Sequence, residues 1–161
     1  MSVLKKVIVL GIGNILMKDD GIGVYAVRAL QEASLPEGID LEIIDGGTAP
    51  DLSVFVDGRV NKLIIVDAAM KGGSPGTIYR LGKGDLTASS SYHVSPHHPG
   101  IYYSLETLTK IGKEPSSVVI FGIEPGTTDF GLELSPQVES IMPRLIDMIL
   151  QEATDTSTTG K

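Results

Sequence analysis

The sequence predicts a single-domain α/β fold, a three-layer sandwich with helices on both faces of a mostly parallel, twisted sheet of about five strands. Three observations lead to this prediction. Short β-branched apolar runs recur along the chain, amphipathic helical patterns separate them, and 161 residues suit one domain with its own core. We expect the domain to span residues 1–153 and the polar residues 154–161, which lack periodicity, to form a flexible tail.

Apolar runs without polar alternation predict the strands, because strands covered by helices on both faces have this pattern. Four such runs are Val7–Leu10, Leu41–Ile44, Leu63–Val66 and Val118–Phe121. The segment Gly76–Leu81 predicts a fifth strand, which we expect nearer an edge of the sheet because it contains Tyr79 and Arg80.

Apolar residues at spacings of three and four predict the helices. The first helix is expected to begin near Asp20 and to bury a stripe from Ile22 to Ala33. A second helix is expected between Pro99 and Gly112.

The C-terminal helical pattern has the clearest start signal. Ser135 is the expected N-cap and Pro136 the first helical residue. Because Pro143 lies within an apolar pattern that continues to Leu150, we expect a kink or a delayed helix start there. The segment Asp51–Val56 predicts one more short helix.

Composition and charge exclude several classes of protein. The chain has no cysteine, which excludes disulfides, zinc–thiolate sites and thiol nucleophiles and favours a reducing, cytoplasmic compartment. Its 13 basic and 20 acidic residues give a net charge of −7, which repels phosphate backbones and disfavours nucleic acid as a partner. No apolar run reaches about 18 residues, so we expect no membrane span.

The loops that follow the predicted strands are the expected place for a ligand, because parallel α/β sheets bind ligands beyond the carboxyl ends of their strands. Gly11–Asn14 resembles the start of a dinucleotide fingerprint, and Asp45 ends the next strand, where a ribose-binding acid would lie. However, the third glycine is missing, and Asp19 and Asp20 would repel a pyrophosphate at the helix start. A Rossmann-like cofactor binder is therefore only an alternative, and Asp19 alone is interpreted as a favourable charge at the helix dipole.

Two carboxylates and a histidine-rich segment predict a metal or catalytic site. Asp20 lies in the loop after the first strand, and Asp67 directly follows the strand Leu63–Val66. All three histidines lie in the segment His93–Pro99, whose prolines keep the chain extended. One of these imidazoles is expected to face the same end of the sheet.

Four motifs occur in order along most of residues 7–150. They are Gly11–Val24 (GIGNILMKDDGIGV), Asp45–Thr48 (DGGT), Leu63–Ala68 (LIIVDA) and Ser95–His97 (SPH). Together they resemble the hydrogenase maturation endopeptidases. The resemblance implies a protease that removes a C-terminal extension from the large-subunit precursor of a nickel-containing hydrogenase after nickel insertion.

The same resemblance implies the metal ligands. Carried over motif by motif, they are Asp20, Asp67 and His97, and the metal they bind represents the nickel of the precursor. His97 is chosen because it completes the SPH motif, while its neighbours His93 and His98 stay open as helpers or replacements.

Two carboxylates and one imidazole leave coordination positions open and suit Ni²⁺, Zn²⁺ or Cd²⁺. We expect nickel to arrive with the substrate, Zn²⁺ or Cd²⁺ to replace it in the isolated protein, and no organic cofactor to bind. Asp20 and Asp67 are also the expected catalytic residues, because an acidic side chain can activate water for amide hydrolysis. The sequence leaves open which acid activates the water, and whether the metal takes part in catalysis or only marks the substrate.

Asn14 and the turn formed by Gly46, Gly47 and Thr48 are expected to line the same cleft and to hold an extended peptide. Glycine permits close backbone approach, and an asparagine amide both donates and accepts hydrogen bonds. We also expect a monomer when the protein is free, because no apolar stripe for dimerisation is evident. A nickel-dependent binding module or chaperone, which uses the same site without cutting, is a further alternative.

Overall fold

The computed structural model describes residues 3–48, 51–86 and 100–155, which form a five-stranded sheet covered by helices on both faces. The strands are β1 (Lys6–Gly11), β2 (Asp40–Asp45), β3 (Lys62–Ala68), β4 (Ile78–Gly82) and β5 (Ser117–Ile123). The α-helices are α1 (Ile22–Gln31), α2 (Gly100–Lys110), α3 (Pro136–Glu139) and α4 (Met142–Thr154). Short 3₁₀ helices span Lys18–Gly21, Leu52–Val54 and Lys83–Asp85.

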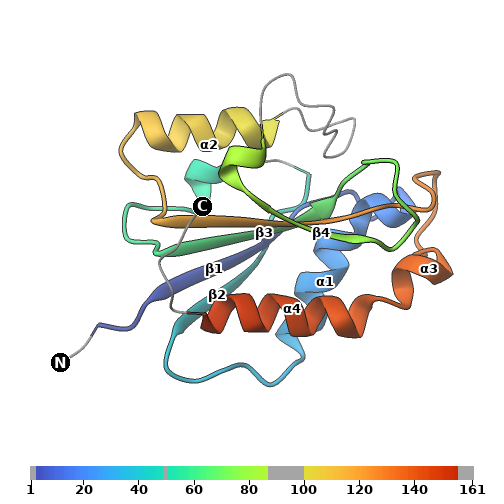
Figure 1. Ribbon diagram of the computed structural model, residues 1–161, viewed down its shortest axis with the longest axis horizontal. Coiled ribbons are helices and arrows are strands. Elements are labelled where there is room, and N and C mark those ends of the chain that lie inside the picture. Colours follow the sequence, from blue (N-terminus) through green and yellow to red (C-terminus); the bar gives the residue numbers. More distant parts are fainter. Residues whose placement is uncertain (1–2, 49–50, 87–99, 156–161) are drawn as a thin grey trace.

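The strand order in the sheet is β2-β1-β3-β5-β4. The first four of these strands are parallel, and β4 runs antiparallel to β5 at the edge. Figure 1 shows α2 on one face of the sheet and α1 and α4 on the other. The predicted α/β sandwich is confirmed, and the carboxyl ends of the parallel strands meet at one end of the sheet.

Alternate strand residues pack into two cores, one on each face of the sheet. In β1, Val7 and Val9 contact the core that contains α1 and α4, whereas Ile8 and Leu10 contact the core that contains α2. All residues of the central strand β3 are buried. The sheet is therefore packed on both faces, and this packing fixes the position of a residue at the end of a central strand.

The edge strands differ from one another in how well the sequence predicted them. The expected fifth strand near an edge is confirmed as β4. The run Leu41–Ile44 forms the other edge strand, β2, which pairs only with β1. Leu41 and Ile43 pack against one core and Ile44 against the other, but none of its residues is fully buried. The apolar run is the same kind as in the central strands, but the place of a strand in the sheet depends on contacts between distant segments.

The structure also defines the residues at which the helices begin. The first helix begins near Asp20, as expected: Asp20 lies in the 3₁₀ turn Lys18–Gly21, and α1 follows directly at Ile22. The expected interruption at Pro143 is confirmed, because α4 begins with this proline in its first turn. The segment Asp51–Val56 forms only a short 3₁₀ helix, capped by the Asp51 carboxylate. The expected helix between Pro99 and Gly112 is confirmed as α2.

Two glycines allow α1 to lie directly against the strand ends. A Cβ on Gly11 would lie 2.1 Å from the carbonyl oxygen of Gly23, and a Cβ on Gly23 would lie 2.1 Å from the carbonyl oxygen of Val66. Only glycine permits backbones to approach this closely. The close approach brings the 3₁₀ turn that contains Asp20 to the carboxyl end of β3.

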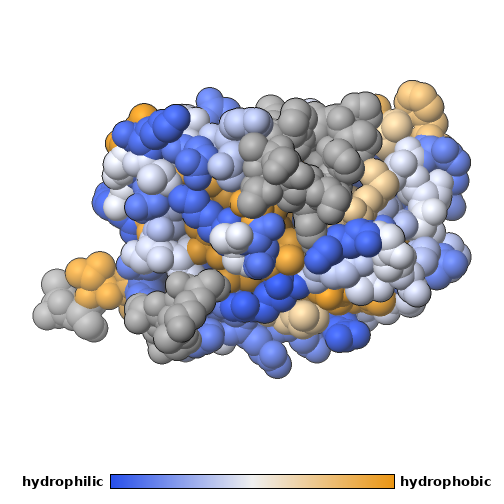
Figure 2. Space-filling model, turned by 45° about the horizontal axis from the view of Figure 1, so that its top comes forward, coloured by the Kyte–Doolittle hydropathy of each residue, from blue (hydrophilic) through white to orange (hydrophobic). Residues whose placement is uncertain are grey.

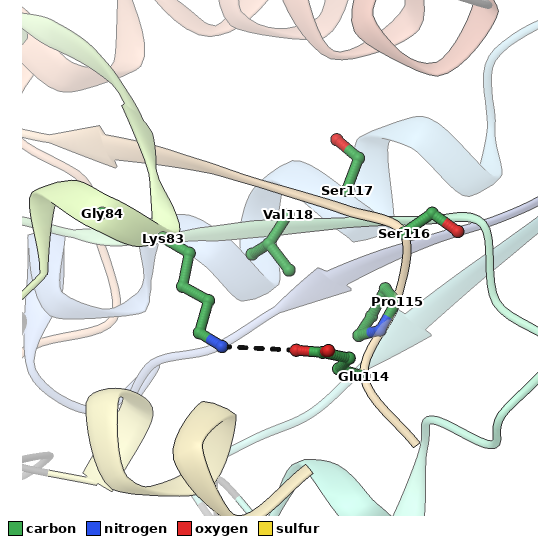
Figure 3. A pocket seen from close by; sticks show the side chains of 7 residues that line it. All are labelled: Lys83, Gly84, Glu114, Pro115, Ser116, Ser117 and Val118. Atoms are coloured by element: carbon green, nitrogen blue, oxygen red, sulfur yellow. Dashed lines mark ion pairs between the residues drawn. The ribbon is translucent and has the colours of Figure 1, made fainter. Parts of the chain in front are cut away.

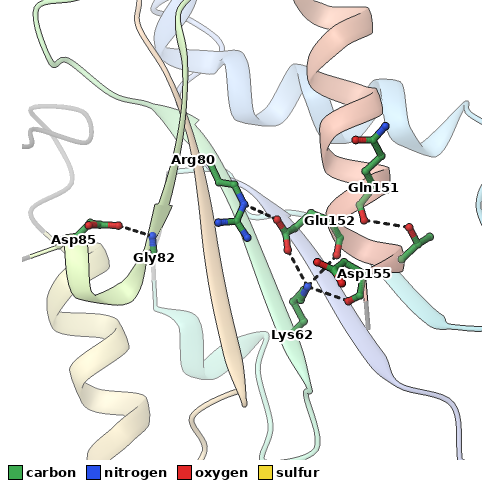
Figure 4. Close-up of polar contacts among 8 residues, drawn as sticks. Lys62, Arg80, Gly82, Asp85, Gln151, Glu152 and Asp155 are labelled. Atoms are coloured by element: carbon green, nitrogen blue, oxygen red, sulfur yellow. Dashed lines mark hydrogen bonds and ion pairs between the residues drawn. The ribbon is translucent and has the colours of Figure 1, made fainter. Parts of the chain in front are cut away.

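The opposite end of the sheet is held by a buried polar network (Figure 4). The Lys62 ammonium donates to Glu152 Oε2 (2.8 Å) and to the carbonyl oxygens of Glu152 and Asp155, and Arg80 Nε donates to Glu152 Oε1 (2.7 Å). Burial raises the pKa of Glu152, but its hydrogen bonds from Arg80 and Lys62 outweigh this and leave the pKa below its usual value. The network joins β3, β4 and the C-terminal end of α4.

Candidate active site

Asp67 lies near the carboxyl end of β3 and is completely buried. Its Oδ1 accepts a hydrogen bond from the backbone N–H of Ala68 (2.7 Å). Its Oδ2 is buried and has no hydrogen-bond partner. A buried carboxylate oxygen without a partner is costly, so its presence indicates that a ligand belongs at this position.

Asp20 is the second buried acid with an unpartnered oxygen. Its Oδ2 accepts from the backbone N–H of Asn14 (3.2 Å), whereas its Oδ1 has no partner. The carboxylate comes from the 3₁₀ turn between β1 and α1, which the contact between Gly23 and Val66 holds against β3. Among the residues that the structure describes, Asp20 and Asp67 carry the buried side-chain oxygens without partners.

Electrostatics connects the two acids. Burial raises the pKa of Asp67 well above its usual range, the hydrogen bond from Ala68 opposes this, and the negative charge of Asp20 raises it further. Two carboxylates with free oxygens in one buried region are suited to a cation, which would satisfy both oxygens and remove their repulsion. The donor set therefore fits a divalent metal ion.

The predicted third ligand, His97, lies outside the described residues, as do the alternatives His93 and His98. Within the described part of the chain, no group of three His, Cys, Asp or Glu side chains could hold a metal ion. The convergence of His97 with the two acids thus stays a prediction.

Asp19 has a different role from Asp20, although the two residues are adjacent. Its buried carboxylate accepts hydrogen bonds from the N–H groups of Gly126 (2.8 Å), Thr127 (3.1 Å) and Ser135 (2.7 Å), and from the Ser135 hydroxyl (2.6 Å). Ser135 occupies the expected N-cap position, but its side chain makes no capping bond, and its hydroxyl donates to Asp19. Asp19 therefore anchors the loop after β5 and is more than a charge at a helix dipole.

A pocket of about 380 Å³ lies beside the acid turn. Its lining includes Asn14, Gly47 and Thr48, three of the four residues expected to hold a peptide. The fourth, Gly46, does not line it, because Gly46 packs behind the turn, where an added Cβ would lie 2.8 Å from Leu10 Cδ1. The backbone bond from Gly13 N–H to the Gly47 carbonyl (2.9 Å) joins this turn to the loop after β1.

Asp45 and Arg28 also line this pocket. Asp45 Oδ1 accepts from Gly47 N–H (2.9 Å), and its Oδ2 lies 3.8 Å from Arg28 Nη2. Its position at the end of β2 was the sequence signal for a site at this end of the sheet. Arg28 carried no such signal, because it lies on the exposed side of α1.

Glu124 is a further buried acid that follows β5 and that sequence patterns did not single out. Its Oε1 accepts from the N–H groups of Lys71 (2.8 Å) and Gly73 (3.0 Å) and from the Tyr79 hydroxyl (2.7 Å). Burial raises the pKa of Tyr79, and the hydrogen bond to Glu124 raises it further. Because Glu124 Oε1 is fully engaged, this acid holds the 71–73 turn in place.

A pocket of about 470 Å³ at the amino end of β5 is a separate feature (Figure 3). Its charged side chains, Lys83 and Glu114, lie 3.5 Å apart and form an ion pair. This pocket lies at the end of the strand remote from the acid pair.

Within the described residues, no helix is long and apolar enough to cross a membrane.

The fold and the site together define a class of α/β protein with an acidic, metal-suited centre at the strand ends. A family model described as hydrogenase maturation protease matches residues 24–152. The hydrogenase 2 maturation protease of Escherichia coli K12 is 33% identical over 147 residues, which cover 90% of this chain and 88% of that protein. The chain therefore belongs to the hydrogenase maturation protease family and is a peptidase.

Solved structures agree with this assignment. The hydrogenase maturating endopeptidase HybD from Escherichia coli has a TM-score of 0.80 and 34% identity, with 91% of each chain covered. The [NiFe] hydrogenase maturation protease HybD from Thermococcus kodakarensis has a TM-score of 0.74 and 25% identity, and the match covers 92% of this chain and 99% of that chain. The α/β architecture is thus shared over nearly the whole length.

Proposed function

We propose that the protein is an endopeptidase that removes the C-terminal extension from the large-subunit precursor of a nickel-containing hydrogenase after nickel insertion. The supporting observation is the pair of buried oxygens, Asp20 Oδ1 and Asp67 Oδ2, that have no hydrogen-bond partner. Nickel held by the precursor supplies the positive charge that these oxygens lack. The protein then acts in the cytoplasm as a monomer that meets each precursor after its metal has been inserted.

The incomplete ligand set makes nickel the recognition signal in this proposal. Asp20, Asp67 and His97 together supply three ligands and leave positions open, whereas a closed structural metal site has four protein ligands. Ligands of the precursor complete the coordination. A precursor without nickel would place two carboxylates against a neutral segment and would bind poorly, which prevents premature cutting.

The pocket beside the acid turn is the proposed place for the peptide on one side of the cut. Asn14, Gly47 and Thr48 line it, and Asn14 Oδ1 accepts a hydrogen bond from the Leu16 N–H (2.9 Å). Gly47 lets the backbone of an extended peptide approach closely and form main-chain hydrogen bonds that demand no particular side chain.

Hydrolysis in this site requires a water molecule and a carboxylate that accepts its proton. The hydroxide oxygen forms a bond to the carbonyl carbon of the scissile amide, the C–N bond breaks, and the departing nitrogen receives a proton. Bound nickel favours the ionised state of Asp67, because an opposite charge nearby stabilises a carboxylate. The same acids thus hold the substrate's metal and provide the negative charge that proton transfer needs.

The test is to incubate the protein with nickel-loaded and nickel-free precursor and to measure the mass of each. We expect loss of a C-terminal peptide only from the nickel-loaded form. The variants Asp20→Asn and Asp67→Asn should abolish cleavage, whereas Asp147→Asn, a matched change at an exposed position on α4, should leave it unchanged.

The other outcomes separate the alternatives. An intact complex with the nickel-loaded precursor would overturn the protease proposal in favour of a chaperone. Efficient cutting of the nickel-free precursor would overturn nickel as the recognition signal. His97→Ala should abolish cleavage, and loss of cleavage in His93→Ala or His98→Ala with full activity in His97→Ala would move the third ligand to that neighbouring imidazole.

A further inference from the structure

Three large, exposed apolar side chains lie at the end of the sheet that carries the acid pair. The exposed fractions are 53% for Leu16, 83% for Phe130 and 64% for Leu132. Backbone bonds join their two segments, because Gly131 N–H donates to the Leu16 carbonyl (2.9 Å) and Lys18 N–H donates to the Gly131 carbonyl (3.0 Å). We call Leu16, Phe130 and Leu132 the apolar ridge.

The position of the ridge can be followed in the figures. Figure 1 shows the loop after β5 at the same end of the molecule as the start of α1, and Figure 2 shows hydrophobic surface at that end. Exposed apolar side chains that gather on one part of a surface mark an interaction site more often than isolated ones.

The loop that carries most of the ridge is firmly anchored. The Asp19 carboxylate binds the N–H groups of Gly126, Thr127 and Ser135, so both ends of the loop are tied to the acid turn. The Tyr25 hydroxyl donates to the carbonyl oxygen of Leu132 (2.6 Å). A ridge held in this way is organised before it binds, which lowers the entropy lost on association.

An acidic pocket adjoins the ridge. Its volume is about 470 Å³, and it is lined by Tyr25, Leu132, Glu133, Leu134 and Glu139. Among these described lining residues there are two carboxylates and no basic side chain. On its other side the ridge is continuous with the candidate site, because Leu16 also lines the pocket of Asn14 and Thr48.

We infer that the apolar ridge docks the protein substrate, an inference that rests on the proposed function. The segment it binds has a large apolar side chain that covers Phe130 and Leu132. A neighbouring lysine or arginine of the same segment pairs with Glu133 or Glu139. Because the ridge adjoins the candidate site without containing either acid, it binds the body of the precursor while the acid pair binds its nickel.

Cleavage kinetics with nickel-loaded precursor test the ridge. Phe130→Ser and Leu132→Ser should each raise KM about tenfold or more while kcat stays within about twofold, since the lost contact is made before and during the reaction. Leu35→Ser is the matched control, because Leu35 is 42% exposed and lies after α1, away from the acid turn. Unchanged KM in both ridge variants would overturn the inference, and thermal melting checks that each variant is folded.

Salt dependence tests the acidic pocket. Glu133→Gln combined with Glu139→Gln should raise KM several-fold at low ionic strength, and the difference should shrink at high ionic strength, because exposed charges are screened. A KM that does not change at either ionic strength would overturn the basic partner segment.

Binding measured apart from cleavage distinguishes the ridge from the proposed function. If the wild-type protein binds the precursor and cuts nothing, while ridge variants bind at least tenfold more weakly, the protease proposal fails and the docking surface stands. If all variants cut the precursor with unchanged KM and Kd, the docking surface fails and the protease proposal stands. If sedimentation shows a wild-type dimer that the ridge variants lose, the occupant is a second copy of this chain and the inference is overturned.

Discussion

Asp67→Asn is predicted to make the free protein more stable and inactive at the same time. The wild-type carboxylate is completely buried, has one oxygen without a partner and is near the charge of Asp20. Asparagine keeps a carbonyl oxygen for the N–H of Ala68 but removes the negative charge. The substitution therefore relieves an unfavourable interaction in the folded state.

The expected size of the gain follows from the cost of burying the Asp67 charge with one oxygen unpartnered, about 1–3 kcal/mol. For a chain of this length, 1 kcal/mol shifts the midpoint of thermal unfolding by about 2–4 °C. Asp67→Asn should therefore raise the midpoint by roughly 2–12 °C. An ordinary buried hydrogen-bonded aspartate would show a loss of stability instead.

The gain should depend on pH with a definite sign. The pKa of Asp67 is raised in the folded protein, so the folded state binds more protons than the unfolded state. Burial of Asp67 lowers the free energy of unfolding of the wild-type protein least below the unfolded pKa of about 3.9. This free energy falls as the pH rises from there through the folded pKa. The difference between variant and wild type should thus be small in acid and grow toward neutral pH.

Thermal and urea unfolding of the metal-free proteins between acidic and neutral pH would measure this difference. Asp147→Asn, at an exposed position on α4, is the control for the change of residue type and should show no comparable gain. A variant that is less stable than the wild type at neutral pH, or a difference that does not vary with pH, would refute the reasoning.

Three further predictions concern residues that hold the site in place. Asp19→Ala removes the acceptor of four hydrogen bonds and should lower the free energy of unfolding by about 3–5 kcal/mol, measured by urea denaturation. A loss below about 1 kcal/mol would contradict the anchoring role of Asp19. Gly23→Ala forces a Cβ to 2.1 Å from the Val66 carbonyl and should cost about 3 kcal/mol, so an unchanged melting temperature would count against the close packing of α1. Lys62→Met should destabilise the protein by about 3 kcal/mol at neutral pH. That loss should fade as acid protonates Glu152, whose lowered pKa stabilises the fold only above its unfolded value, and a pH-independent loss would contradict the ion pair.

Local sequence determined the strands, most of the helices and the end of the sheet where the site lies. Apolar runs such as Leu63–Val66 and the position of Asp67 directly after them carry this information within a few residues. The interruption at Pro143 is equally local, because proline excludes itself from a helix interior through its own ring and missing N–H. Chain order and the rules of parallel sheets then place Asp20 and Asp67 at one end.

Tertiary structure decided which of two adjacent acids is a ligand candidate and which is an anchor. Asp19 and Asp20 have the same side chain, but the partners of Asp19 lie more than 100 residues away in the loop after β5. The exposed edge of β2, the position of Gly46 behind its turn and the apolar ridge also depend on such distant contacts. Spacing along the chain encodes the period of a strand or helix, whereas a hydrogen bond or a shared surface exists only after distant segments have packed together.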